Sequence, residues 1–438
     1  MALCNPVIVV PGITASRLRD EYPVSPEMVW DALNKDYRAV SLHPEDIRYE
    51  LVEPARVTPD AAFSVVYKHL IEELRYNLSE DADKAVPVFP FAYDWRQPLE
   101  RTETELAQFI QEVIDRTKLL KHYHRAGFDE TPKVNLIGHS MGGLIIAGYL
   151  ARSGAEPRVD KVASLGSPFR GSLEAVLKIT TGTADLGEQT PPASREREAA
   201  RLTPALYYLL PSFDGAVETL ADDLQSDLFE VDAWQESVVE TLATFIHNHG
   251  VRRTNAKERK KQARELFGRL LGAARAHREL IESLDLAAAG LEPDRWLCVA
   301  GVDSTTRVTL KIDSHYNMPL FDLTSKDRRN DWQHENEDQH VFTGDGTVPF
   351  LGAEPGFLKR ENLICVKPGD FGYWEVKDQL LRRAAGFHGM LPNLNLAHRL
   401  IVSHFLGRPH KGTWGRPAPH VSRDAWDPAV PGLKPKSD

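Results

Sequence analysis

Short apolar runs bounded by turn residues alternate along this chain with longer stretches in which apolar residues recur at helical spacing. The apolar runs predict buried strands at residues 7–10, 85–91, 133–137, 161–165, 296–300 and 362–366. Helical patterns lie between the early strands, at residues 60–78 and 102–123. This rhythm is typical of parallel βαβ units, so we expect an α/β protein with a mostly parallel central sheet flanked by helices.

The rhythm stops in the middle of the chain, where long helical patterns replace the strands over residues 171–292. We interpret this segment as a large helical cap or lid that divides the core into two parts, residues 1–170 and 293–411. The last segment, residues 412–438, is rich in proline, glycine and charge and lacks periodicity. It is therefore expected to be a poorly ordered tail.

One helical pattern of the cap is amphipathic. Its apolar positions are Leu266, Phe267, Leu270, Leu271, Ala274, Ile281 and Leu284. A basic run precedes it, formed by Arg252, Arg253, Lys257, Arg259, Lys260 and Lys261. We favour a lid helix with one solvated face, and peripheral contact with a membrane through the lid is the open alternative.

Composition and charge narrow the class of protein. A chain of 438 residues that is 42% hydrophobic and 26% charged matches a globular enzyme, and a net charge of -10 argues against binding to nucleic acid. The three cysteines, Cys4, Cys298 and Cys365, allow at most one disulfide. The start of the chain lacks an export-signal pattern, and no apolar run reaches the roughly 20 residues of a membrane span. We therefore expect a cytoplasmic protein with reduced thiols.

The strongest chemical signal is a G-x-S-x-G motif, Gly138-His139-Ser140-Met141-Gly142, which directly follows the predicted strand at 133–137. In an α/β-hydrolase, this motif turns a strand sharply into a helix and exposes the serine as a nucleophile. The small glycines let the backbone pass closely while the serine is held in a strained conformation. The motif therefore predicts an α/β-hydrolase fold with Ser140 as the nucleophile.

A serine nucleophile needs a histidine to take its proton and a carboxylate to orient that histidine. In this fold, the acid and then the histidine follow the serine along the chain. Asp345 lies in a glycine-flanked turn and is the preferred acid, with Asp370 as the alternative. His388 lies in a loop between two helical patterns and is preferred as the base to His398 and His404, which lie inside the final helical pattern.

The negative charge that develops on an attacked carbonyl needs two preorganised hydrogen-bond donors. One donor is expected to be the amide of Met141, the residue after the nucleophile, and the other should come from a loop after an early strand. In that loop Pro11 has no N–H, so the amide of Ile13 is preferred and that of Gly12 comes next. Gly12, His139 and Trp95 are expected to line the substrate site, although for Trp95 a packing role is favoured over contact with an acyl chain.

Further short stretches accompany the serine motif. They are Val9-Val10-Pro11-Gly12, Trp30-Asp31-Ala32-Leu33-Asn34, Tyr93-Asp94-Trp95-Arg96, Ser164-Leu165-Gly166-Ser167-Pro168 and Gly344-Asp345-Gly346-Thr347-Val348. With these stretches in this order, the chain resembles the lecithin:cholesterol acyltransferase family, which includes lysosomal phospholipase A2 and plant phospholipid:diacylglycerol acyltransferases. The cap matches that family only weakly, chiefly at residues 206–211.

This resemblance implies a triad of Ser140, Asp345 and His388, an oxyanion hole from the amides of Ile13 and Met141, and no metal or cofactor. It also implies chemistry on acyl-ester lipids. Secreted and lysosomal members carry a signal sequence and a disulfide-closed flap near the segment that matches Trp30, and this chain has neither, which speaks against an extracellular role.

The sequence therefore predicts a lipase, phospholipase or O-acyltransferase that acts through an acyl-enzyme. Hydrolysis and acyl transfer share the first half-reaction, so the sequence does not separate them. A carboxylesterase or thioesterase for smaller soluble esters is the second reading. A non-catalytic binding protein on a hydrolase fold is the third, because a fold alone does not determine function. The sequence gives no indication of the oligomeric state.

Overall fold

The computed structural model describes residues 3–436, except 23–24, 45, 47, 49, 52–54, 155–157, 183–193, 222–223, 251–253, 317, 324–327, 373–374 and 376–385. Two of the basic residues considered above, Arg252 and Arg253, lie outside the described residues.

A parallel six-stranded sheet forms the centre of the molecule. Its strands are β1 (Val7–Val10), β5 (Val88–Pro90), β6 (Val134–His139), β7 (Val159–Leu165), β9 (Trp296–Gly301) and β14 (Leu363–Val366). Their order across the sheet is β14-β9-β7-β6-β1-β5, and each neighbouring pair is parallel. The predicted parallel sheet is confirmed, and with its flanking helices it is an α/β-hydrolase fold.

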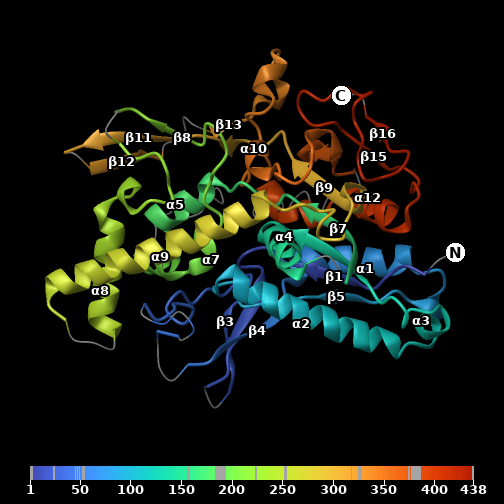
Figure 1. Ribbon diagram of the computed structural model, residues 1–438, viewed down its shortest axis with the longest axis horizontal. Coiled ribbons are helices and arrows are strands. Elements are labelled where there is room, and N and C mark those ends of the chain that lie inside the picture. Colours follow the sequence, from blue (N-terminus) through green and yellow to red (C-terminus); the bar gives the residue numbers. More distant parts are fainter. Residues whose placement is uncertain are drawn as a thin grey trace.

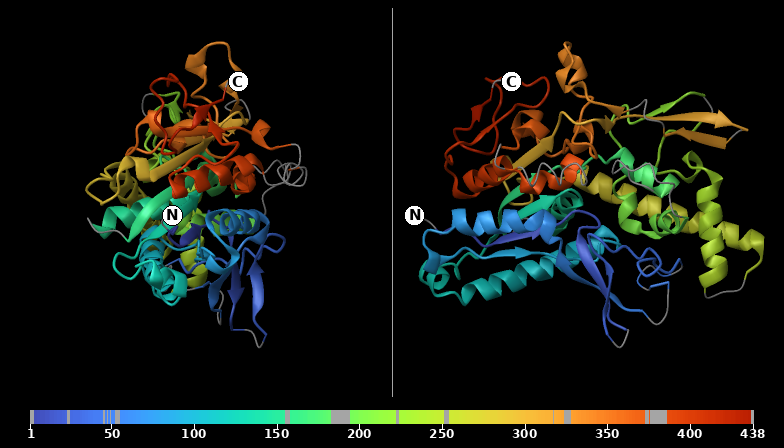
Figure 2. Two further views of the ribbon diagram at one scale, coloured as in Figure 1. Left: turned by 90° about the vertical axis from the view of Figure 1, so that its right-hand side faces the viewer. Right: turned by 180° about the vertical axis from the view of Figure 1, so that it is seen from behind.

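Both faces of this sheet are buried, which explains why its strands read as continuous apolar runs. Val7 and Val9 of β1 pack on one face and Ile8 and Val10 on the other, because successive side chains of a strand point to opposite sides. Helices α1 (Ser64–Leu78) and α12 (Asn395–Leu406) contact each other on the Val7 face. Helices α2 (Leu99–Lys118) and α4 (Met141–Ser153) cover the opposite face (Figures 1 and 2).

The two early helices differ in their bounds from the predicted patterns. The pattern at 60–78 becomes a helix only at Ser64, because strand β4 (Val57–Ala62) takes up the preceding residues. Strand β4 pairs with β2 (Ser16–Asp20), which also pairs with β3 (Glu27–Trp30), in a small antiparallel sheet. The pattern at 102–123 is divided between α2 and a short helix, α3 (Lys121–Arg125).

The cap contains helices and also strands. Its helices are α5 (Leu173–Thr181), α6 (Ser194–Leu202), α7 (Pro204–Tyr207), α8 (Glu236–His249) and α9 (Ala256–Glu282). Strand β8 (Val217–Thr219) pairs with β11 (Leu310–His315), which pairs in turn with β12 (Met318–Asp322). Chain from beyond residue 293 thus returns to the cap (Figure 1, left). The short strands β10 (Thr306–Arg307) and β13 (Arg328–Arg329) pair with each other, and helix α10 (Phe350–Ala353) follows.

The long helix α9 joins the cap to the core. All seven apolar positions of the predicted stripe are buried, six of them in α9 and Leu284 just beyond its end, and the helix packs against α4 and α8. Lys260 and Lys261 of the basic run are exposed on its other side. The apolar face of this helix therefore packs against other parts of the protein. Within the described chain, no helix has both the length and the hydropathy needed to cross a bilayer.

The C-terminal segment differs from the poorly ordered tail that we expected. Residues 412–436 lie against the core, with Ala418, Trp426 and Val430 buried. Strands β15 (Trp414–Gly415) and β16 (Lys434–Pro435) pair with each other, and Trp426 Nε1 donates to the carbonyl of Leu363 at 2.8 Å. A few apolar anchors in an aperiodic segment are enough to hold it in place, and a search for periodicity does not detect them.

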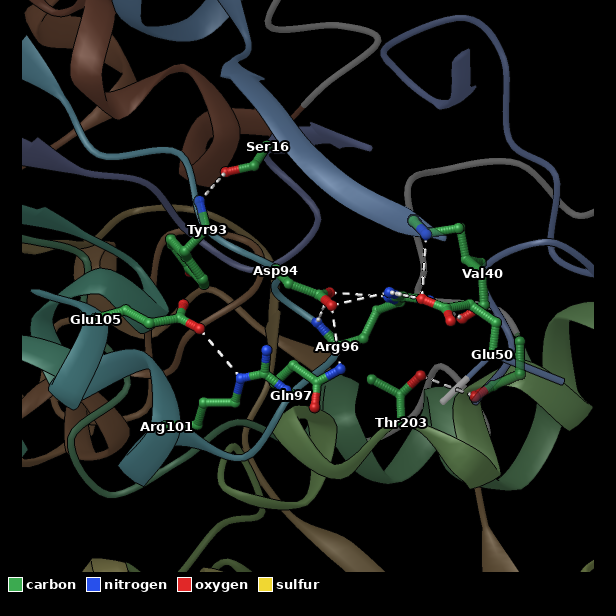
Figure 3. Close-up of polar contacts among 12 residues, drawn as sticks. Ser16, Val40, Glu50, Tyr93, Asp94, Arg96, Gln97, Arg101, Glu105 and Thr203 are labelled. Atoms are coloured by element: carbon green, nitrogen blue, oxygen red, sulfur yellow. Dashed lines mark hydrogen bonds and ion pairs between the residues drawn. The ribbon is translucent and has the colours of Figure 1, made fainter. Parts of the chain in front are cut away.

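A buried ion pair follows strand β5. The Arg96 guanidinium is fully buried and donates to both carboxylate oxygens of Asp94 at 2.8 Å, with Glu50 at 3.5 Å (Figure 3). The neighbouring side chains Tyr93 and Trp95 are also buried. This segment therefore supports the structure next to the carboxyl end of the sheet, and the packing role favoured for Trp95 fits its burial.

Candidate active site

Ser140 stands at the turn between strand β6 and helix α4. Its φ of 53° and ψ of -127° lie in a region that residues with a side chain seldom adopt. The amide of Ser140 donates to the carbonyl of Leu165 on β7 at 3.0 Å. The sharp turn predicted from the motif is therefore present, and it holds the serine at the carboxyl edge of the sheet.

Two glycines make this turn possible. A Cβ on Gly142 would lie 2.2 Å from the carbonyl oxygen of Val10, and one on Gly138 would lie 2.6 Å from the amide nitrogen of Gly143. Both neighbours are backbone atoms that have no room to move away. The motif requires glycine at these positions because strand β1 and the start of α4 pass directly over them.

The structure brings Ser140, His388 and Asp345 into direct hydrogen-bond contact. His388 Nε2 lies 2.9 Å from Ser140 Oγ, although the two residues are 248 positions apart, and His388 Nδ1 lies 2.6 Å from Asp345 Oδ2. Because a carboxylate only accepts, Nδ1 carries the proton and Nε2 is free to accept from the serine hydroxyl. The imidazole side chain is 12% exposed and Asp345 1%, so the pair is screened from bulk water but open toward the serine.

Backbone groups fix the orientation of the Asp345 carboxylate. Its Oδ1 accepts from the amides of Thr347 at 3.0 Å and Val348 at 2.7 Å, which leaves Oδ2 for His388. The carbonyl of Asp345 also accepts from the amide of His388 at 3.1 Å. The Asp-Gly turn thus caps its own backbone, as an ordinary turn would, and presents a carboxylate oxygen to the imidazole.

The alternative candidates are engaged elsewhere. Asp370 forms a two-point ion pair with buried Arg416 at 2.6 and 2.9 Å. His398 contacts the carbonyl of Pro392, and the two ring nitrogens of His404 contact the carbonyls of Ala429 and Arg295. Each of these side chains is buried as part of the core packing.

The two amides expected to bind an oxyanion have no competing acceptor among the described residues. Neither Ile13 N–H nor Met141 N–H donates to another group within the described part of the chain. The amide of Gly12, which was the second choice, donates to the hydroxyl of Tyr67 at 2.9 Å. The loop lies directly against the nucleophile, since a Cβ on Gly12 would come within 2.9 Å of Ser140 Cβ.

A cavity of about 360 Å³ opens in front of Ser140. Its wall is largely apolar and includes Ile13, Trp30, Val40, Phe63, Val66, Trp95, Leu206 and Leu209, together with Gly12, His139 and His388. Lys178 pairs with Glu196 in this wall, and its Nζ lies 5.7 Å from the centre of the Tyr37 ring. Helices α5 and α6 of the cap therefore supply part of the wall. Within the described residues, no cluster of three or more side chains is suited to hold a metal ion.

Tyr67 is a site residue that the sequence did not reveal. It lies in the first turn of α1, in a pattern that predicts only a packing face, yet its hydroxyl contacts both Gly12 and His139 behind the serine. Lys178 was also missed, because its place in the cavity depends on how the cap folds back over the core. No local signal in the sequence distinguishes either residue.

Buried histidines should make the stability of the fold depend on pH. Burial, with a smaller contribution from His388, lowers the pKa of His139 to about 3, and burial lowers that of His404 to about 4. In the unfolded chain both titrate near pH 6.5. As the pH falls below about 6.5, only the unfolded chain takes up these protons, so the free energy of unfolding should fall, by up to about 1.4 kcal/mol per pH unit for each histidine.

Urea denaturation between about pH 7.5 and pH 5.5 tests this, because carboxylates barely titrate in that range. The variant His404→Gln should show a weaker dependence on pH. Exposed His247 serves as the control, and His247→Gln should keep the full dependence. A free energy of unfolding that stays constant over this range would contradict the prediction.

The parallel sheet, the strained serine and the aligned imidazole and carboxylate place the molecule in the α/β-hydrolase class. The model of the lecithin:cholesterol acyltransferase family matches residues 59–354, which is more than half of the chain. The chain therefore belongs to the lecithin:cholesterol acyltransferase family, and the resemblance noted from its motifs is confirmed.

One relative agrees with this membership, and one solved structure shares the fold. The chain is similar to lecithin-cholesterol acyltransferase-like 4 of Arabidopsis thaliana, with 24% identity over 200 residues, 38% of this chain and 35% of the relative. The match thus spans about a third of that relative's length. The crystal structure of the Tle4-Tli4 complex contains a chain with the same fold, at a TM-score of 0.55 and 14% identity over 90% of this chain and 96% of the other.

Proposed function

We propose that this protein is a serine hydrolase or acyltransferase that acts on acyl-ester lipids. The observation that carries the proposal is the line of contacts from Ser140 Oγ through His388 to Asp345, at 2.9 and 2.6 Å, next to a largely apolar cavity. Membership of a lipid acyltransferase family supports the same chemistry. A cavity wall whose surface is mostly apolar suits an acyl chain better than a highly polar substrate.

In the proposed reaction, Ser140 Oγ attacks the ester carbonyl carbon while its proton passes to His388 Nε2. The carbonyl π electrons move onto oxygen, and the resulting oxyanion accepts hydrogen bonds from the amides of Ile13 and Met141. When the tetrahedral intermediate collapses, the carbon–oxygen bond to the leaving alcohol breaks, and His388 returns the proton to that alcohol. An acyl-Ser140 ester remains.

The second half-reaction repeats these steps with a new nucleophile. His388 takes a proton from water or from an acceptor alcohol, whose oxygen attacks the acyl-enzyme. Collapse of the second intermediate breaks the bond to Ser140 Oγ, and the serine recovers its proton from His388. Water gives a free fatty acid, and an alcohol gives a new ester.

The test has two parts. First, a fluorophosphonate probe should label the wild-type chain and Ser153→Ala, a serine at the far end of the same helix, but not Ser140→Ala. Second, purified protein is incubated with phospholipids, neutral lipids and short p-nitrophenyl esters, with and without a long-chain alcohol, and the products are separated. Fatty acid or new ester from the lipids supports the proposal.

Two results would contradict the proposal. Release from short soluble esters alone would make the protein a small-substrate esterase. Equal labelling of wild type and Ser140→Ala, with no turnover of any ester, would leave a binding protein on a hydrolase fold.

A further inference from the structure

A chain of buried hydrogen bonds runs behind the nucleophile and links parts of the site that are far apart in sequence. The amide of Gly12 donates to Tyr67 Oη at 2.9 Å, and Tyr67 Oη lies 2.8 Å from His139 Nδ1. His139 Nε2 then lies 3.0 Å from the carbonyl oxygen of His388. Tyr67 is 1% exposed and His139 4%, so water does not compete for these bonds.

The direction of each bond follows from the groups involved. The tyrosine oxygen accepts from the amide of Gly12, so its single proton is left for His139 Nδ1. That nitrogen must then be unprotonated, and the ring proton sits on Nε2, where it donates to the carbonyl of His388. A protonated His139 would place a second donor against Tyr67, and burial keeps the pKa of His139 low, at about 3. The His139 tautomer with its proton on Nε2 therefore gives every donor and acceptor in this series of hydrogen bonds a partner.

The two ends of this chain are the two parts of the site that must be placed against Ser140. Gly12 begins the loop whose next residue, Ile13, offers a free amide, and the bond to Tyr67 holds that loop against the nucleophile. At the other end, the backbone of His388 is held on both sides, through its amide by Asp345 at 3.1 Å and through its carbonyl by His139. The imidazole is thus anchored independently of its own side-chain contacts.

We propose that Tyr67, acting through His139, is a positioning residue that fixes the oxyanion loop and the base relative to Ser140. The inference rests on the proposed function, since it names what aligns that same site. Because the amide of Gly12 is committed to Tyr67, it also assigns the loop donor to Ile13. Tyr67 touches neither Ser140 nor the imidazole of His388 by hydrogen bond, so its effect on the reaction is indirect.

The variant Tyr67→Phe keeps the ring and removes only the hydroxyl. It should lower kcat for a short p-nitrophenyl ester about 10- to 100-fold, the loss expected when supporting hydrogen bonds behind a reacting group are removed. KM should change by less than about twofold, because the cavity wall keeps its shape. The matched control is Tyr123→Phe, which removes an equally buried hydroxyl that donates to the carbonyl of Cys4 at 2.7 Å and not to Gly12, His139, Ser140 or His388. Its kcat should stay at the wild-type value.

A double-mutant cycle shows whether Tyr67 and His139 act on kcat together, through their hydrogen bond, or independently through separate effects on packing. If Tyr67 acts through His139, the double variant Tyr67→Phe/His139→Asn should lose no more kcat than His139→Asn alone. His139→Gln, whose amide can reach the position of Nε2, should retain more kcat than His139→Asn. Unchanged kcat in folded Tyr67→Phe, or losses that simply multiply, would overturn the inference. Should Tyr67→Phe fail to fold, the comparison of the two His139 variants decides.

Amide hydrogen exchange provides a readout that does not require activity. Tyr67→Phe should speed exchange in peptides covering residues 10–14 and 386–390, and Tyr123→Phe should not. If the wild type turns over no ester and binds no probe, the proposed function fails while this exchange still tests the link. Unchanged exchange at residues 386–390 would disprove the link even in an active enzyme.

Discussion

Replacing His388 by alanine should lower kcat for any accepted ester by about 10⁵-fold or more, because the serine then has no group to take its proton. His388 Nε2, at 2.9 Å, is the nitrogen that contacts Ser140 Oγ. KM should change little, since most of the cavity wall remains. Single-turnover kinetics with a p-nitrophenyl ester measure the loss in the acylation step directly.

His398→Ala is the matched control. His398 lies one helix further along, is buried, and contacts the carbonyl of Pro392 at 2.6 Å. Its removal should lower the free energy of unfolding but leave kcat of the folded protein close to the wild-type value. If His398→Ala abolished turnover while His388→Ala kept it, the base would have to be reassigned.

Asp345→Asn should lower kcat by about 10⁴-fold without a comparable change in KM. The reason lies in the backbone contacts of Asp345. The amides of Thr347 and Val348 require an oxygen at the Oδ1 position, so an asparagine would turn its NH₂ group toward His388 Nδ1. That donor favours the tautomer with the proton on Nε2, which cannot accept a proton from Ser140. Steady-state kinetics and a urea denaturation curve on the same preparation test this.

Asp370→Asn is the matched control, and it should lower the stability of the protein without lowering kcat. Asp370 is paired with the buried guanidinium of Arg416 at 2.6 and 2.9 Å. Removing its charge breaks this buried ion pair and should cost about 3–5 kcal/mol of stability, a typical penalty for such a change. The remaining folded protein should keep its kcat. An Asp370→Asn enzyme that is stable but inactive would move the acid to Asp370.

Local sequence was sufficient for the elements of the core. Each predicted strand is present, because a strand buried on both faces needs a continuous apolar run whatever its neighbours are. The serine turn was equally readable, since its glycines are required by contacts with the adjacent strand and helix. The sheet order and the cap strands were not readable. β8 and β11 pair across more than ninety positions, and nothing in either short run of residues indicates that the two would pair.

For the candidate site too, the sequence predicted some features and not others. Motif and chain order were enough to select Ser140, Asp345 and His388, and the structure brings these three side chains together. The alternative Asp370 could be set aside only when its partner Arg416 was seen, in a segment that we had expected to be poorly ordered. The choice between the amides of Gly12 and Ile13 also depended on a partner, Tyr67, from another element.

The sequence by itself determined the class of fold, the position of the strained serine and the residue types needed to activate it, because these leave short signals along the chain: continuous apolar runs, a glycine-flanked serine, and an acid and a histidine that follow it in order. The tertiary structure decided which polar groups meet, which amides are left free beside the nucleophile, and which residues of the cap line the cavity. Such contacts join elements dozens to hundreds of residues apart. Their energies depend on distance and burial in space, which the order of residues along a chain does not record.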